Sequence, residues 1–175
     1  MVETVLMVLV PEAEPLAGPF RDRFDPSAAQ GAPAHITILY PFLPPDRIDA
    51  RVAAMLEDCC AKQAPIDFQL QEIRRFAPDP VLYLTPDPAA PFHRLTEAIW
   101  QLFPETPPYA GRHKEIVPHL SLAWVETVAA LSAIEADFRA AASPHLPISA
   151  RVTALELFDN VTGRWEQRRV FPFAA

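Results

Sequence analysis

Two short histidine-led segments, about half the chain apart, limit the possible folds of this sequence more than any other feature. The first reads PAHITILYPF over residues 33–42, and the second reads VPHLSLAW over residues 117–124. Both are rich in β-branched, aromatic or other apolar residues and begin near a proline, which predicts a strand in each. A pattern that recurs at this distance in 175 residues indicates an internal repeat.

Each predicted strand carries an imidazole and a hydroxyl on one face. Side chains alternate along a strand, so His35 lies beside Thr37, and His119 beside Ser121, at a spacing of about 7 Å. The same alternation puts Tyr40 on the opposite, apolar face of its strand. We therefore expect Tyr40 to pack in the core.

The order of predicted elements repeats in the two halves. The first half is expected to run strand, helix, histidine strand, helix, strand over residues 5–10, 16–24, 35–40, 48–59 and 66–76. Asp46 is the expected N-cap of the helix over 48–59. The second half is expected to run strand, helix, histidine strand, helix and two closing strands over 81–84, 92–103, 119–124, 127–142, 148–158 and 165–173. We expect a single domain, 1–175, with pseudo-repeats at roughly 1–80 and 81–175.

Composition narrows the classes of partner. Half of the residues are hydrophobic, which is enough for a sizeable core, and the net charge of −7 argues against holding long nucleic acid on a broad basic surface. The adjacent Cys59 and Cys60 offer neither a disulfide framework nor a zinc-site spacing. The apolar run at residues 5–10 is too short for a signal peptide or a membrane span. We expect a cytoplasmic protein that does not bind membranes.

At this point the sequence resembles a known family. The paired motifs HIT at 35–37 and HLS at 119–121, in halves of matching element order, resemble the two-histidine (2H) phosphoesterase superfamily. Within that superfamily the resemblance is to bacterial 2′-5′ RNA ligase-like proteins, and it covers nearly the whole chain, including LYPF after the first motif. It implies an α+β fold of two pseudo-symmetric lobes, whose antiparallel sheets form a central cleft with the four motif side chains pointing into it.

The resemblance also implies an activity. The expected reaction opens a 2′,3′-cyclic phosphate and leaves a 2′-phosphate, with His35 and His119 as the acid–base pair. Thr37 and Ser121 would donate hydrogen bonds to the non-bridging phosphate oxygens. No metal or other cofactor is expected. Imidazoles of ordinary pKa would place the optimum at roughly pH 6–7.5.

Two further residues are candidates for substrate binding. Phe42 could stack on a base, and Arg112, in the basic run 112–114, could reach a second phosphate, although a solvated loop explains that run equally well. The second motif continues as AWVE, where RNA-handling relatives often carry an arginine. Together with the acidic balance, this departure favours a small cyclic phosphate as substrate, such as a nucleoside 2′,3′-cyclic phosphate or an ADP-ribose cyclic phosphate. An RNA terminus with a cyclic phosphate is also an expected partner, and we expect the protein to be a monomer. The alternatives are a reversible 2′-5′ RNA ligase and a non-catalytic module that binds nucleotides or RNA ends.

Overall fold

The computed structural model describes residues 2–175, which form an α+β fold with two four-stranded antiparallel sheets. The first sheet has the order β2-β1-β7-β8, and the second has the order β5-β4-β3-β6. The strands are β1 (Thr4–Leu9), β2 (His35–Leu39), β3 (Ile66–Arg75), β4 (Val81–Asp87), β5 (Leu120–Trp124), β6 (Ile148–Val152), β7 (Ala154–Asp159) and β8 (Glu166–Pro172). The α-helices are α1 (Glu14–Phe24), α2 (Pro26–Ala29), α3 (Ala50–Cys60), α4 (Ala90–Leu102) and α5 (Val128–Ala142).

The two sheets draw strands from both halves of the sequence. β3 precedes residue 81 but pairs with β4 and β6 in the second sheet, whereas β7 and β8 complete the first sheet beside β1. The expected repeats, 1–80 and 81–175, therefore do not coincide with the two sheets. Because each sheet needs strands from both halves, this interleaving supports our proposal that residues 1–175 fold as one domain.

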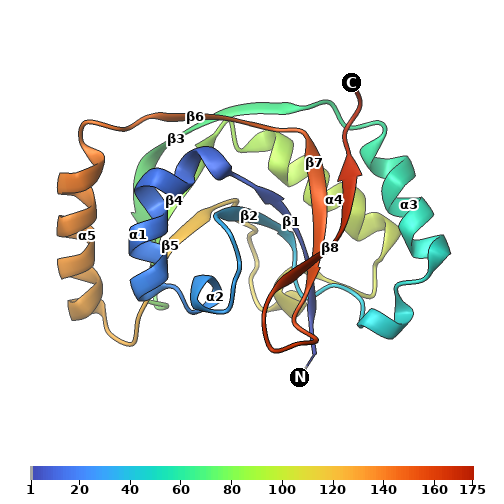
Figure 1. The fold of residues 1–175 in the computed structure, drawn as a ribbon, viewed down its shortest axis with the longest axis horizontal. Helices are drawn as coiled ribbons and strands as arrows, with labels where there is room; N and C mark the ends of the chain where they lie inside the picture. Colours follow the sequence, from blue (N-terminus) through green and yellow to red (C-terminus); the bar gives the residue numbers. More distant parts are fainter. Residues whose placement is uncertain (1) are drawn as a thin grey trace.

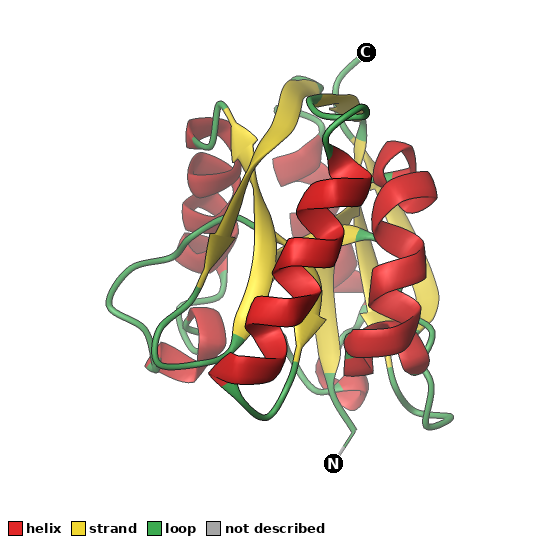
Figure 2. Cartoon of the chain, turned by 90° about the vertical axis from the view of Figure 1, so that its left-hand side faces the viewer, coloured by secondary structure: helices red, strands yellow, loops and turns green. Residues whose placement is uncertain are grey.

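The helices cross over in the same way. α1 follows β1 but packs against β5, and α4 follows β4 but packs against β2. Figure 1 shows β2 and β5 near the middle of the molecule, with α5 at one end and α3 at the other. Figure 2, seen from the α5 side, shows helices lying in front of the strands. No helix within residues 2–175 is both long and apolar enough to cross a membrane.

The closing strand expected over 148–158 is two strands. β6 pairs with β3 in the second sheet, and β7 pairs with β1 in the first, with Thr153 between them. The Phe173 N–H donates to the Thr153 carbonyl at 2.8 Å, which ties the crossing point to the end of β8. The expectation of one strand was wrong because a continuous run of strand-forming residues does not reveal a change of sheet.

The N-cap expected at Asp46 was also wrong. Asp46 lies in a short 3₁₀ turn, Pro45–Arg47, and α3 begins one turn later. The Asp49 carboxylate accepts a hydrogen bond from the Val52 N–H at 2.9 Å and caps the helix.

A β-bulge follows each histidine motif at the same position. Opposite β1, Thr37 pairs with Met7 and Leu39 pairs with Leu6, so Ile38 is an extra residue. Opposite β4, Ser121 pairs with Tyr83 and Ala123 pairs with Leu82, so Leu122 is an extra residue. The repeat thus extends to an irregularity of the backbone.

These bulges correct the expected position of Tyr40. Strict alternation would put Leu39 beside His35 and Tyr40 in the core. In the structure Leu39 is fully buried in the main core, whereas Tyr40 is half-buried and packs with Val5 and Met7. Met7 pairs with Thr37, so Tyr40 returns to the face of the strand that carries the motif. We call this side of each histidine strand the motif face.

Candidate active site

The fold brings the two histidine motifs together from different sheets. His35 begins β2 and His119 immediately precedes β5, and each of these strands lies at the edge of its sheet. β2 and β5 contact each other. The charge of His119 makes a small contribution to the lowered pKa of His35, in agreement with the contact between the two strands.

Each imidazole makes an equivalent hydrogen bond to the main chain of its own motif. His35 Nδ1 lies 2.7 Å from the Pro33 carbonyl oxygen, and His119 Nδ1 lies 2.6 Å from the Val117 carbonyl oxygen. A carbonyl oxygen can only accept, so Nδ1 carries the hydrogen in each ring. In both neutral rings Nε2 is then left as the proton acceptor. In both motifs the carbonyl group two residues before the histidine therefore selects the same tautomer, the one with hydrogen on Nδ1.

The pKa of each histidine is lowered. Burial is the main cause for His35, and with the nearby Arg21 guanidinium it brings the pKa down from 6.5 to about 4. Burial also lowers the pKa of His119. Both rings are consequently neutral at pH 7 in the protein without substrate. Asp25 acts in the opposite direction on both histidines, since its negative charge favours the imidazolium.

A buried ion pair supplies these charges. The Arg21 and Asp25 side chains are 2% and 4% exposed and lie 3.0 Å apart. Arg21 Nη2 also donates to the Ala32 carbonyl at 3.2 Å, and the Ser27 N–H donates to Asp25 at 2.9 Å. Every charge in this cluster has a hydrogen-bond partner, which is what a buried ion pair requires. The cluster fixes the end of α1 next to both motifs.

The two histidines differ in their aromatic neighbours. His119 packs edge-on against Phe76, with ring centroids 4.9 Å apart, and against Tyr83, at 5.3 Å. Phe76 and Tyr83 stack on each other at 4.1 Å. Phe76 and Tyr83 restrict the rotation of the His119 ring and contribute to its burial.

Thr37 and Ser121 are half-buried at matched positions beside the histidines. The nearby Thr37 hydroxyl opposes the effect of burial, which raises the pKa of the Tyr109 phenol to about 12. Tyr109 and Ala110 both have positive φ angles, 53° and 54°, a conformation that costs energy in residues other than glycine. This strained segment leads into the second motif and places an aromatic residue beside the first.

The two other predicted binding residues differ in exposure, because Phe42 is buried and Arg112 is exposed. Phe42 is 5% exposed and packs edge-on against Phe103, with centroids 5.1 Å apart, in the core. Its ring offers no free face to a base. The expectation that Phe42 stacks on a base was therefore wrong. Arg112 is exposed, and its charge opposes the burial that raises the pKa of Tyr40 to about 12, which places it near the motif face of β2.

Two cavities adjoin the second motif at opposite ends. One, of about 650 Å³, includes Val117 and Pro118 in its lining, together with Arg74, His93 and Lys114. The other, of about 220 Å³, is lined by Asp22, Arg23, Phe24, Asp25, Pro26, Ala29, Trp124 and Val125. Residues 119–121 lie between these two along the chain. Within residues 2–175, no three or more histidine, cysteine or acidic side chains are grouped to hold a metal ion.

Several residues around the motifs escaped the sequence analysis. Arg21 and Asp25 sit in and just after a helix, where charged residues are ordinarily solvated. Trp124 and Tyr83 lie within the strands predicted over 119–124 and 81–84, and we assigned them no role in a site. The spacing of four between Arg21 and Asp25 was a possible signal for an ion pair. We find no sequence signal for the position of Tyr109.

Comparison with solved structures gives the same fold. The chain is 14% identical to Escherichia coli LigT in a complex with 3′-AMP, with a TM-score of 0.62, and the match covers 99% of this chain and 98% of that one. It is 17% identical to TT0787 of Thermus thermophilus, also at a TM-score of 0.62, with 98% and 97% covered. A structure described as a phosphoesterase matches at 13% identity and a TM-score of 0.59, with 99% and 98% covered.

Sequence comparison identifies the family. The search of curated proteins gives no match. The family model of the 2′-5′ RNA ligase superfamily matches residues 9–164, which include both histidine motifs. With most of the chain matched and the two-sheet fold shared, this protein belongs to the 2′-5′ RNA ligase superfamily of 2H phosphoesterases.

Proposed function

We propose that this protein is a cyclic phosphodiesterase that opens 2′,3′-cyclic phosphates of small nucleotides or RNA ends. The observation that carries the proposal is the matched hydrogen bonding of His35 and His119, which leaves Nε2 of each ring as the free nitrogen. A pair of imidazoles near one phosphorus supplies both a base and an acid near neutral pH. Family membership supports phosphoryl-transfer chemistry.

The proposed step is a single in-line displacement. The Nε2 of one neutral imidazole takes a proton from water while the water oxygen bonds to phosphorus. The bond from phosphorus to the ribose O3′ breaks, and the other histidine, as imidazolium, gives its proton to O3′. The products are a 2′-phosphate and a free 3′-hydroxyl. Proton exchange with solvent then restores the starting charge of the pair.

Thr37 and Ser121 are proposed to bind the non-bridging phosphate oxygens. Each hydroxyl lies beside its histidine on the motif face, so both can donate to the group on which the histidines act. Negative charge grows on those oxygens in the transition state, where such donors are most effective. Arg112, exposed near Tyr40, remains a candidate contact to a further phosphate.

Small substrates are favoured over long RNA. The net charge is −7, and Trp124, Val125 and Glu126 after the second motif include no cation to hold an RNA backbone. The similar LigT has been solved with 3′-AMP, NADP+ and ATP. All four motif side chains come from one chain, so we propose that a monomer suffices.

The test is a substrate panel assayed with a chelator present. It contains the four nucleoside 2′,3′-cyclic phosphates, a short RNA with a cyclic phosphate end, and paired RNA ends for ligation. We expect nucleoside 2′-phosphates as products, identified by chromatography against 2′- and 3′-phosphate standards. A preparation carrying both His35→Gln and His119→Gln controls for contaminating phosphodiesterases. Joining of RNA ends without hydrolysis would support the ligase, and binding without turnover would support a non-catalytic module.

A further inference from the structure

Trp124, at the end of β5, is an exposed aromatic side chain that the proposed chemistry does not use. It is 60% exposed, the largest fraction among the exposed large hydrophobic residues of the described chain. Within residues 2–175 its ring makes no aromatic pair or cation–π contact. A single exposed apolar side chain is ordinary on a protein surface, and Trp124 differs from such residues through the strand face and the cavity that it adjoins.

The β-bulge directs Trp124 to the motif face. Ser121 pairs with Tyr83, and Trp124 pairs with Val81, two residues along the same strand β4. Residues two apart on a strand share a face, so Trp124 lies on the same face as Ser121, about 7 Å further along. Without the extra residue Leu122, Trp124 would point to the opposite side of the sheet. Tyr40 has the equivalent position after the first motif, but its hydroxyl donates to Glu3 at 2.8 Å and its ring packs against Trp165.

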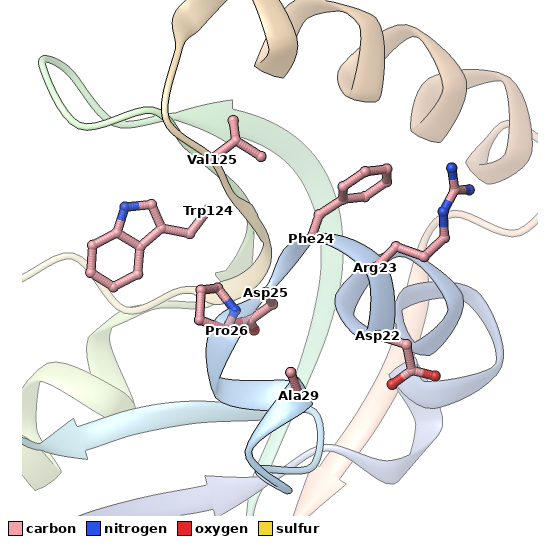
Figure 3. A pocket seen from close by; sticks show the side chains of 8 residues that line it. All are labelled: Asp22, Arg23, Phe24, Asp25, Pro26, Ala29, Trp124 and Val125. Atoms are coloured by element: carbon pink, nitrogen blue, oxygen red, sulfur yellow. The ribbon is translucent and has the colours of Figure 1, made fainter.

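A small cavity adjoins this tryptophan. Figure 3 shows the Trp124 indole extending to one side of Asp25 and Pro26, with Asp22 and Arg23 on the other side. The cavity volume is about 220 Å³, below the roughly 300–1,000 Å³ of pockets for drug-sized ligands. This size suits one planar ring rather than a longer chain. Asp25, which lines this cavity, pairs with Arg21, and its charge acts on both His35 and His119.

We propose that Trp124 is a stacking platform for the nucleobase of the substrate. The indole and Pro26 provide apolar walls for a planar ring, while the cyclic phosphate lies at the histidines. Arg21 neutralises Asp25, and the rim carries one charge of each sign, Asp22 and Arg23, so no excess of positive charge favours a second phosphate there. This inference rests on the proposed function and adds to it the residue that holds the base of a nucleoside 2′,3′-cyclic phosphate.

The cavity at the other end of the motif suits a base less well. Its lining contains no phenylalanine, tyrosine or tryptophan, and it carries more charged side chains than the cavity beside Trp124, among them Arg74, Lys114, Glu72 and Asp87. Such a rim binds water and polar groups more readily than an aromatic ring. The substrate is therefore oriented with its base toward Trp124.

The test compares substrates with and without a base. The ratio of kcat/KM for adenosine 2′,3′-cyclic phosphate to that for glycerol 1,2-cyclic phosphate is measured in the parent protein, Trp124→Ala and Trp124→Phe. Stacking contributes about 1–3 kcal/mol per base, so we expect Trp124→Ala to lower the ratio about 5- to 150-fold, chiefly through KM. Trp124→Phe should keep most of the parental ratio, because phenylalanine also offers a ring for stacking. Trp100→Ala, at a 38% exposed tryptophan on α4, is the matched control and should leave the ratio unchanged.

A binding measurement separates this inference from the proposed function. The indole N–H resonance of Trp124 is followed by NMR during titration with adenosine 2′-monophosphate and, separately, ribose 5-phosphate. We expect a shift with the nucleotide alone. If no cyclic phosphate is turned over but this shift occurs, the proposed function is wrong and the base site stands. If turnover occurs and Trp124→Ala leaves the ratio unchanged, the base site is wrong and the proposed function stands.

Discussion

At the scale of single residues, the two imidazoles share a tautomer but not an environment. His119 is flanked by Phe76 and Tyr83, whereas His35 is under the influence of the Arg21 guanidinium. Sequence alone predicted the histidines and hydroxyls because they belong to a repeated motif with strand periodicity. It could not predict their neighbours, since Arg21 lies in α1, Phe76 directly follows β3 and Tyr83 lies in β4, and only the fold brings them to the histidines.

The lowered pKa values change the expected pH dependence. Catalysis needs one imidazolium and one imidazole, and in the free protein this state is most populated between the two pKa values, with His35 at about 4 and His119 below 6.5. We therefore expect kcat/KM to be highest below pH 6.5, lower than the optimum of roughly pH 6–7.5 for unshifted imidazoles. A bound phosphate anion favours the imidazolium, so the kcat profile should lie at higher pH than the kcat/KM profile. Initial rates from pH 4 to 9 check both; a kcat/KM that still rises at pH 8 would be incompatible with this pair.

The hydroxyls should act mainly on the transition state. We expect Thr37→Val and Ser121→Ala each to lower kcat by about 10²-fold with little change in KM, because removing one donor to a developing oxyanion has an effect of this order. Thr162→Val, at an exposed hydroxyl in the β7–β8 turn, is the control and should keep parental kinetics. An effect confined to KM would instead identify Thr37 and Ser121 as ground-state binding groups.

At the scale of elements, periodicity predicted most helices and strands but not the irregularities that aim side chains. The helix expected over 127–142 is present as α5, capped by Thr127. The bulges after the motifs were missed because one extra residue leaves no mark in a run of apolar residues. That omission put Tyr40 on the wrong face and hid the exposure of Trp124. The burial of Phe42 was missed for another reason. Its partner Phe103 follows α4 and is distant in the sequence, so the contact could not be foreseen.

The capping of α3 can be tested with a matched pair of variants. Asp49→Ala should lower the free energy of unfolding by about 1 kcal/mol, since it removes the acceptor for the Val52 N–H. Asp46→Ala, three residues earlier and outside the helix, should change it by less than about 0.5 kcal/mol. Urea unfolding followed by circular dichroism measures both. An equal or larger loss for Asp46→Ala would reassign the cap.

At the scale of the whole molecule, strands and helices follow one another in a similar order in the two halves of the chain, but the two sheets do not correspond to those halves. Each sheet contains strands from both halves, and α1 and α4 pack on the sheet opposite to the one their preceding strands occupy. The pairing of β3 with the second sheet and of β7 and β8 with the first could not be inferred from sequence, because strand pairing joins residues that are distant along the chain. The effect of this pairing is to bring the two edge strands, β2 and β5, side by side, so that each half contributes one histidine and one hydroxyl.

The central claim is that His35 and His119 act together on one cyclic phosphate, and turnover by single variants tests it most directly. Hydrolysis of a nucleoside 2′,3′-cyclic phosphate is measured, with chelator, for the parent protein, His35→Gln and His119→Gln, with the exposed His145→Gln as control. We expect both motif variants to lose at least about 10²-fold in kcat/KM while retaining the parental circular dichroism spectrum, and the control to keep its rate. Near-parental turnover by either folded motif variant would contradict the two-histidine mechanism.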